Sequence, residues 1–289
     1  ALSYLDTIVL RKGRSYGRPF SCIKGDSMAN MTSSASASQV AAELSSATFE
    51  EIPALVERYR DDPRQQVQKA CERALRRLNK EQAERDRVFE MYHAMRDFGG
   101  EGVIVGVDEV GRGSVAGPLT VCAVALPSDP VVWGINDSKQ LIPAKREVLA
   151  VRIAEVADAI GICHISPSRI DEVGMGVALR EAVAGAVADT GLEPDCVLMD
   201  GNPLGAVPNE RDVVHGDARI ACIAAASIVA KVTRDELMVE LDAEYPEYHF
   251  AQCKGYASAD HIAAIREFGL SPQHRVSFCG NFLETASLF

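Results

Sequence analysis

The sequence predicts an α/β protein in which a central sheet is flanked by helices and preceded by a small helical segment. Three observations carry this prediction: short β-branched runs bounded by glycine or proline, helical periodicity between those runs, and a separate helix-like stretch before the first run. The 289 residues are 47% hydrophobic and 25% charged, as in ordinary globular proteins. No apolar run approaches the ~18 residues that span a bilayer, so we expect no membrane association.

The chain before the first strand divides into two expected parts. Residues 1–38 lack periodicity, and we expect them to be disordered, or to include an extension upstream of a natural start near Met28. Basic residues near the start are not followed by the apolar core of a secretory signal. Residues 39–100 are the predicted helical extension, in which Thr48 and Glu51 match a capping box and apolar residues recur at three- and four-residue steps.

Positive charge is concentrated in this extension. Eleven Lys and Arg residues lie from Arg58 to Arg96, whereas the whole chain has a net charge of −11 and a pI near 5.1. The acidic balance argues against a surface coated with bases for nucleic acid. The favoured interpretation is therefore a solvated helix face with ion pairs at four-residue spacing, and a face that steers a duplex is the alternative.

Residues 101–289 alternate between strand and helix patterns, which predicts one α/β domain that carries the candidate catalytic residues. The expected strands are at 103–107, 115–126, 161–165 and 196–199. The expected helices are at 146–160, 168–173, 177–188, 220–243 and 258–268.

Eight cysteines are present, and none forms a C-x-x-C pair. Most stand singly in apolar runs, which predicts buried reduced thiols in a cytoplasmic protein. A disulfide framework or a zinc site is the alternative.

Four acidic residues stand where short apolar elements begin or end. Asp108 and Glu109 follow the first strand, Asp200 follows a later one, and Asp217 comes just before the long helix. Salt-bridged turns would account for each of them singly. Carboxylates that converge repel one another, and divalent cations relieve that repulsion. Because successive strand residues point to opposite faces, Asp108 and Glu109 share a site only if the strand ends or bulges there.

The glycines after Glu109 allow a second interpretation. Gly111, Gly113 and Ala116 match the G-x-G-x-x-A loop that binds dinucleotides. That fingerprint needs a helix directly after the glycines, whose N-terminus holds the pyrophosphate. Here the residues from Pro118 onward predict a strand, so we reject a nucleotide-cofactor site.

Six segments occur together in one order, and they resemble ribonuclease HII, a divalent-metal nuclease with the ribonuclease H-like mixed sheet. They are GVDEVGRGSVAGP (106–118), NDSKQL (136–141), LMDGNPL (198–204), GDARIACIAAASIVAKVTRD (216–235), KGYASADH (254–261) and SPQHRVSF (271–278). Residues 46–98 resemble the helical N-terminal extension of some bacterial members. His215 departs from the family, which commonly has lysine there.

The resemblance implies an endonuclease that cuts on the 5′ side of ribonucleotides, in RNA–DNA hybrids and at single ribonucleotides in duplex DNA, leaving 3′-hydroxyl and 5′-phosphate ends. It implies two-metal catalysis with Mg²⁺ or Mn²⁺. The implied metal ligands are Asp108, Glu109, Asp200 and Asp217, and the implied substrate contacts are Gly111, Arg112 and Gly113 at the ribose 2′-hydroxyl, Tyr256 at the sugar and Lys139 at a phosphate.

Other residues have less specific implications. The tail Thr285–Phe289 resembles peptides captured by bacterial sliding clamps, although an apolar tail packed on its own domain is the favoured interpretation. For His261, His274 and Arg275 we expect structural or substrate-positioning roles, and for Trp133 local packing. Another nuclease or strand-transfer enzyme of this fold, or a silent binding module, are the remaining alternatives. We expect a monomer.

Overall fold

The computed structural model describes residues 35–283. The chain divides into two compact units, which meet between Arg87 and Val88. The expectations for the first 34 residues and for the tail Thr285–Phe289 concern positions outside the described range.

The smaller unit contains helices α2 (Ala37–Ser46), α3 (Ile52–Arg58) and the first part of α4 (Gln65–Gly99). Apolar side chains from all three helices form its core, among them Val40, Leu44, Ile52, Tyr59 and Val67. Helix α2 begins two residues before the helical region that the sequence predicted. The Ser- and Ala-rich sequence around residue 36 lacks the apolar periodicity that would have indicated the N-terminus of this helix. In the structure, Ser36 and Gln39 form a complete capping box there.

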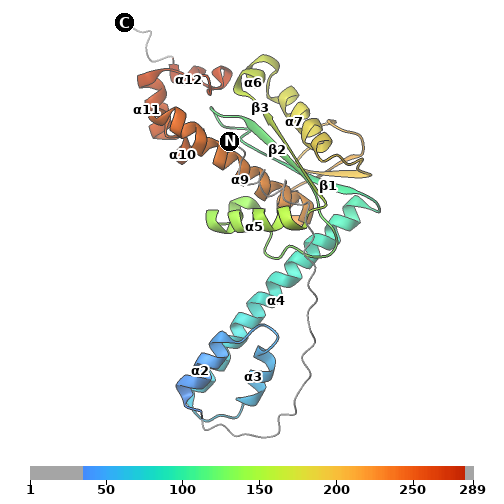
Figure 1. Ribbon diagram of the computed structural model, residues 1–289, viewed down its shortest axis with the longest axis vertical. Coiled ribbons are helices and arrows are strands. Elements are labelled where there is room, and N and C mark those ends of the chain that lie inside the picture. Colours follow the sequence, from blue (N-terminus) through green and yellow to red (C-terminus); the bar gives the residue numbers. More distant parts are fainter. Residues whose placement is uncertain (1–34, 284–289) are drawn as a thin grey trace. The chain divides into compact units, whose positions relative to one another are not determined.

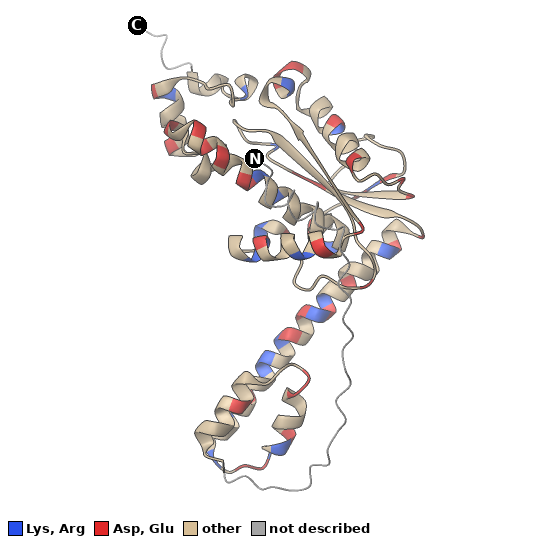
Figure 2. Cartoon of the chain, in the orientation of Figure 1, with Lys and Arg blue, Asp and Glu red and all other residues tan. Residues whose placement is uncertain are grey.

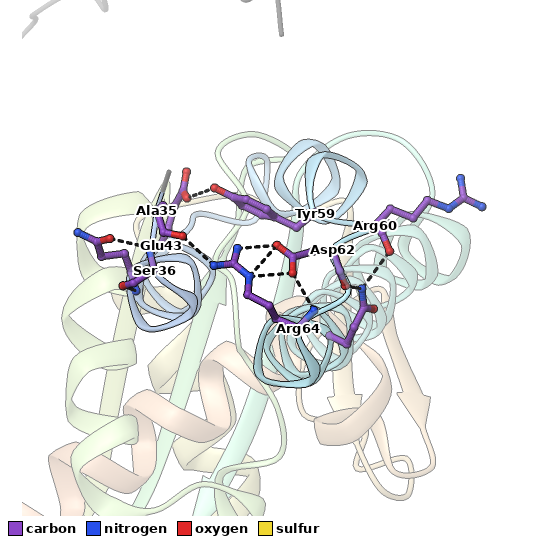
Figure 3. Close-up of polar contacts among 9 residues, drawn as sticks. Ala35, Ser36, Glu43, Tyr59, Arg60, Asp62 and Arg64 are labelled. Atoms are coloured by element: carbon purple, nitrogen blue, oxygen red, sulfur yellow. Dashed lines mark hydrogen bonds and ion pairs between the residues drawn. The ribbon is translucent and has the colours of Figure 1, made fainter. Parts of the chain in front are cut away.

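Polar contacts tie the ends of these helices together (Figure 3). Arg64 donates hydrogen bonds to both carboxylate oxygens of Asp62, at 2.6–3.2 Å, and to the carbonyl of Ala35 at 2.8 Å. The Tyr59 hydroxyl donates to Glu43 at 2.7 Å. Asp62 therefore has a pKa lowered to about 2, mainly because the Arg64 side chain donates to it.

The capping box predicted at Thr48 forms only in part. The Thr48 amide donates to the Glu51 carboxylate at 2.8 Å, but α3 begins at Ile52 and has no side-chain cap. Helix α4 carries charged residues of both signs along its length (Figure 2). Exposed pairs such as Arg76–Glu72 and Arg85–Glu81 join residues four apart, as the favoured interpretation predicted.

A five-stranded mixed sheet organises the larger unit, in the order β3-β2-β1-β4-β5. Its strands are β1 (Ile104–Val110), β2 (Leu119–Ala125), β3 (Ala159–Ile165), β4 (Cys196–Asp200) and β5 (Glu210–Val213). Strands β1, β2 and β3 pair antiparallel, whereas β1, β4 and β5 pair parallel. The mixed sheet confirms the predicted fold class. Strand β5 was missed because this edge strand is polar and mostly exposed, so it has no apolar run.

Helices cover both faces of this sheet (Figure 1). On one face lie α5 (Pro143–Val156) and α9 (Ala221–Glu244), and on the other α6 (Pro167–Val173) and α7 (Met175–Asp189). Gly106 permits the close contact between β1 and α9, because a Cβ there would lie 2.3 Å from the backbone carbon of Cys222. The small residues of α9 serve the same approach, since its first ten are all buried.

The last turns of α4 belong to this core. Val88, Met91, Tyr92 and Met95 pack in the same cluster as α5 and α9, and the Tyr92 hydroxyl accepts from the Val132 amide at 3.0 Å. This packing explains why the compact units meet inside α4 rather than at its end. The predicted domain limit at residue 100 coincides with the C-terminus of the helix, where Gly99 is followed by Gly100 with φ 81°.

Short elements complete the larger unit: η1 (Ser138–Gln140), α8 (Gly216–Arg219), η2 (Pro246–Tyr248), α10 (Phe250–Cys253), α11 (Ala259–Phe268), η3 (Val276–Phe278) and α12 (Gly280–Leu283). The last five pack with the end of α9. Within residues 35–283, no helix combines the length and apolar character needed to cross a membrane. All seven cysteines in that range are free.

Candidate active site

Two of the four predicted carboxylates are neighbours on β1. The expected strand end or bulge at this point is wrong, because β1 continues in regular register, with Asp108 opposite Cys122 and Glu109 opposite Val121. The two side chains therefore leave opposite faces of the sheet. They still share one electrostatic environment near the sheet edge, since the charge of Glu109 raises the pKa of Asp108.

The other two carboxylates come from β4 and α8. Asp200 is the last residue of β4, which runs parallel to β1. Both strands therefore carry acids near their C-terminal ends, on the same side of the sheet's length. The Gly216 amide donates to Asp200 Oδ1 at 2.7 Å, which brings α8 and its buried Asp217 to that strand end. The sequence placed Asp217 at the start of the long helix, but the residue belongs to the separate short helix α8. The extended backbone of Ile220 separates α8 from α9.

Burial makes this carboxylate group costly to charge. The pKa of Asp108 is raised to about 8, first because the group is desolvated and then because Glu109 and Asp200 are negative nearby. Burial also raises the pKa of Glu109, with a further contribution from Asp200, while Arg112 opposes the shift. A nearby cation would relieve both effects.

A lysine ammonium lies beside Asp217. Lys139 Nζ lies 3.1 Å from Asp217 Oδ2 and 3.7 Å from Asp137 Oδ1. Burial of Lys139 lowers its pKa, but the hydrogen bond to Asp217 and the surrounding carboxylates outweigh this, so the pKa is raised overall. Lys139 is thus a charged neighbour of the carboxylate group.

The four carboxylates suit a hard divalent cation by their chemistry. Carboxylate oxygens are the ligands that Mg²⁺ and Mn²⁺ prefer, and the pKa of Asp108 is raised first by burial and then by the neighbouring charges of Glu109 and Asp200. In the described part of the chain, no three His, Cys, Asp or Glu side chains are arranged to hold a metal ion. Binding therefore requires these side chains to turn toward a shared ion.

Sequence reasoning missed two serines beneath this group. The Ser227 side chain of α9 lowers the pKa of Asp108, in opposition to burial. Its Oγ lies 2.9 Å from Ser138 Oγ, and both serines are buried. A serine inside the apolar run of α9 was the available signal, since buried hydroxyls need partners.

The glycine turn that follows β1 is held from behind by two buried arginines. Arg275 Nη1 donates to the carbonyls of Gly111 at 2.7 Å and Arg112 at 3.2 Å, and its other nitrogens donate to Gly117. Arg234 donates to the carbonyls of Pro118, Ala116 and Lys254. Neither arginine is exposed. Arg234 was missed by sequence reasoning, although a charge inside the long helix was a signal.

Glycine is required at the first position of this turn. Gly111 has φ 86°, and a Cβ there would lie 2.3 Å from Arg234 Nε. Gly113 has no heavy atom within 4 Å of such a Cβ, so space is open in front of it. Arg112 is largely exposed and lies 3.7 Å from Glu109.

Tyr256 lies beside this turn. The carbonyl of its neighbour Gly255 accepts from the amides of Val115 at 2.9 Å and Ala116 at 3.1 Å. The Tyr256 residue is 41% exposed, and its ring centre lies 5.7 Å from the Arg234 guanidinium carbon. These contacts join the segment of Tyr256 to residues 115 and 116, which follow the Gly111–Gly113 turn at the end of β1.

The remaining singled-out residues lie elsewhere. Trp133 packs edge-to-face on Phe89, with ring centres 5.1 Å apart, which confirms local packing. His215 adopts a left-handed conformation immediately before α8. The rejected dinucleotide loop is indeed followed by a strand, β2.

Comparison with known proteins identifies the family. The ribonuclease HII family model matches residues 105–281, and the model of the ribonuclease HII N-terminal domain matches residues 36–97. The chain belongs to the ribonuclease HII family. It is 43% identical to ribonuclease HII of Geobacillus thermodenitrificans, over 77% of this chain and 86% of that one. It is 45% identical to that of Lachnoclostridium phytofermentans, over 78% and 89%. The protein is therefore an RNase H endonuclease.

Solved structures agree with the ribonuclease H-like fold. Ribonuclease H2 from Pyrococcus horikoshii OT3 has a TM-score of 0.55 and 26% identity, covering 63% of this chain and 98% of that one. Ribonuclease HII of Archaeoglobus fulgidus, solved in a complex with PCNA, has a TM-score of 0.53 and 25% identity, covering 61% and 94%. Bst-RNase HIII, solved in complex with Mn²⁺, shares the fold with a TM-score of 0.53 at 19% identity, covering 67% and 73%.

Proposed function

We propose that this ribonuclease HII hydrolyses the phosphodiester bond on the 5′ side of a ribonucleotide, both in RNA–DNA hybrids and at single ribonucleotides in duplex DNA. The products carry 3′-hydroxyl and 5′-phosphate ends. One observation carries the proposal: the carboxylate-bearing end of β1 runs directly into the Gly111–Gly113 turn, and Tyr256 lies beside that turn.

Asp108, Glu109, Asp200 and Asp217 are the proposed ligands of Mg²⁺ or Mn²⁺. Two such ions, when bound, supply the positive charge that activates water and stabilises the leaving 3′ oxygen. The buried position of Asp108 and its raised pKa support this role, because a cation offsets both desolvation and the neighbouring charges. The Gly216 amide donates to Asp200 and so orients that carboxylate, and the nearby Ser227 side chain lowers the pKa of Asp108 against the effect of burial.

Lys139 is the proposed phosphate contact. Its ammonium pairs with Asp217 at 3.1 Å while its side chain remains 75% exposed, so it can leave that carboxylate for a phosphate oxygen. Such contacts fix the register of a duplex without reading its sequence. The charge of Lys139 also compensates Asp217 before any cation binds.

The Gly111–Arg112–Gly113 turn is the proposed reader of the ribose 2′-hydroxyl. Telling RNA from DNA at one nucleotide requires a contact with that group. Arg234 and Arg275 bind the carbonyls on the buried side of the segment 111–118, while the space in front of Gly113 is open. Tyr256, which is partly exposed, is the proposed contact with the sugar, and such a contact penalises a misplaced ribose.

A sliding clamp is a proposed partner. The segment involved is Thr285–Phe289, outside the described residues, and the support is its resemblance to clamp-binding peptides together with the PCNA complex of the Archaeoglobus fulgidus relative. Deletion of these five residues is expected to weaken binding to a clamp in a titration, and unchanged affinity would contradict it. We further propose a monomeric, cytoplasmic enzyme.

The main test uses one labelled DNA duplex with a single ribonucleotide, incubated with Mg²⁺ or with EDTA. We expect one cut on the 5′ side of the ribonucleotide, with a 3′-hydroxyl and a 5′-phosphate, and no cut in EDTA. An all-DNA duplex of the same sequence is the matched control. Equal cleavage of both duplexes, or a cut on the 3′ side, would refute the proposed specificity.

A further inference from the structure

Two buried histidines form a hydrogen-bonded pair behind Tyr256. His261 Nε2 lies 3.0 Å from His274 Nε2, and neither residue is more than 3% exposed. His261 belongs to the first turn of α11, whereas His274 lies in the segment before η3, 13 residues later. Neither imidazole contacts the carboxylate group, so the hydrolytic step described above leaves the pair without a role.

Hydrogen bonds at the two ends fix the direction of every proton in the pair. The Ser271 amide can only donate, and it donates to His274 Nδ1 at 2.9 Å. The neutral His274 ring therefore carries its proton on Nε2 and donates to His261 Nε2. His261 then carries its proton on Nδ1, which lies 2.8 Å from the Tyr256 carbonyl oxygen. The chain of bonds runs in one direction, from the Ser271 amide to the Tyr256 carbonyl.

The surroundings keep both rings neutral. Tyr248 and Phe250 enclose the pair, with ring centres 4.7 Å and 5.7 Å from that of His274. Burial lowers the pKa of both histidines, that of His274 to about 4 with a further contribution from His261. Each ring therefore carries a single proton at neutral pH, on Nε2 in His274 and on Nδ1 in His261.

The backbone that these bonds hold is strained. Lys254 and Gly255, immediately before Tyr256, both have positive φ, 52° and 77°, and the lysine pays a steric cost there. The Tyr256 carbonyl accepts from the Ser258 amide at 2.8 Å and from His261, whereas the ring projects toward solvent. His261 therefore supplies a second donor to the carbonyl of this tight turn.

We propose that the His261–His274 pair is a positioning device that sets the Tyr256 wall of the ribose slot. The opposite wall, the glycine turn, is held by Arg275, which directly follows His274 in sequence. One short segment therefore holds both walls, and their separation determines whether a lone ribose is gripped. This inference rests on the proposed role of Tyr256. In it, the two histidines do not contact the substrate.

Substitution at His274 tests the inference through substrate preference. Preference is the ratio of kcat/KM on a duplex with one ribonucleotide to kcat/KM on a uniform RNA–DNA hybrid. His274→Phe keeps the ring volume but leaves His261 Nε2 without its donor, and we expect the preference to fall about tenfold, with kcat on the hybrid within about twofold. His274→Gln restores a donor at the Nε2 position, and we expect it to restore most of the preference.

A double-mutant cycle and a matched control separate positioning from stability. If His274 acts through Tyr256, then His274→Phe has no further effect on preference in a Tyr256→Ala background. Tyr248→Phe removes the part-buried hydrogen bond of the hydroxyl to the Gly269 carbonyl but keeps the ring that packs on the pair, and it should leave the preference unchanged. An unchanged preference in folded His274→Phe, or additive effects in the cycle, would overturn the inference.

The wild-type protein offers a test that needs no variant. Nitrogen-15 NMR of the imidazoles should show His261 protonated at Nδ1, the less common tautomer of a free imidazole, and His274 at Nε2. Protonation of both rings at Nε2 would overturn the inference even if His274→Phe does not fold. A wild-type enzyme that shows no cleavage at a single ribonucleotide would instead refute the proposed function, so the two failures are distinguishable.

Discussion

The two halves of the site are built in different ways. The carboxylate half uses residues at the ends of adjacent sheet strands and in one short helix, so the sheet itself brings Asp108 and Asp200 to one edge. The proposed sugar-reading half uses a glycine turn and Tyr256, which are held by buried side chains from distant segments, Arg234, Arg275 and the two histidines. The comparison teaches that the proposed chemistry depends on sheet topology, whereas the proposed selectivity depends on long-range polar contacts.

The largest effect is expected in the carboxylate half. Asp108→Asn should reduce cleavage about a thousandfold, which corresponds to about 4 kcal/mol of transition-state stabilisation. Binding of the duplex should survive, because the sugar-reading half is unchanged. Single-turnover rates and a fluorescence titration measure the two quantities. Wild-type cleavage by the variant would contradict the metal-ligand assignment.

The same variant should be more stable in metal-free buffer. The folded-state pKa of Asp108 is raised from 3.8 to about 8, so in the wild type its contribution is fully present below pH 3.8 and is lost as pH rises through 8. Asparagine cannot ionise and avoids that loss. In urea unfolding with EDTA at pH 9, we expect Asp108→Asn to gain about 1–3 kcal/mol.

A smaller loss of activity is expected in the sugar-reading half. Arg275→Ala removes the donors to the carbonyls of Gly111, Arg112 and Gly117. We expect it to destabilise the protein by about 2–4 kcal/mol, since buried carbonyls lose their partners. Cleavage at a single ribonucleotide should fall more than cleavage of a uniform hybrid. Equal losses on both substrates would show that the turn does not set selectivity.

The histidine pair makes stability depend on pH. The pKa of His274 is about 4 in the folded protein, below the ~6.5 of an unfolded chain. Its contribution is therefore complete above pH 6.5 and is lost as pH falls toward 4, by on the order of 3 kcal/mol. Urea unfolding across that window measures the loss. His274→Gln should flatten this part of the pH profile, and a profile as steep as that of the wild type would contradict the assignment.

The smallest effect is expected on the surface of α4. Glu81→Gln breaks the pair of Glu81 with Arg85, which spans 3.0 Å between partly exposed side chains. Such pairs contribute about 0.3–0.5 kcal/mol. Thermal unfolding and cleavage should therefore change little. A loss of more than about 1 kcal/mol in the free energy of unfolding would contradict the interpretation of this helix face as a solvated surface.

The sequence predicted the carboxylate half better than its support. The apolar run before Asp200 marks the end of β4, and the run before Asp108 places that residue near the end of β1, which continues to Val110. Helix α9 was predicted within a residue of its observed start and end. Strand β5 was missed because it has no clear apolar pattern, and the predicted helical region began two residues after the observed start of α2. Asp217 lies in a separate helix because the backbone of Ile220 is extended, and an isoleucine in the sequence does not indicate a break between two helices.

The supports of the sugar-reading half could be predicted only in part. Arg234 and Ser227 are polar residues inside an apolar helix, and that exception was a usable signal. The pairing of His261 with His274 depends on tertiary folding, because α11 must turn back on the segment before η3. The folded coordinates were therefore needed to connect either histidine with Tyr256.

Mn²⁺ binding to the free enzyme tests the central claim most directly. Calorimetric titration should detect Mn²⁺ binding by the wild type and by Tyr256→Ala, and at least about tenfold weaker binding by Asp108→Asn and Asp200→Asn. This pattern would separate the half of the site that holds cations from the half that reads sugars. Equal affinity in all four proteins would contradict the account, because the carboxylates would then not be the cation ligands.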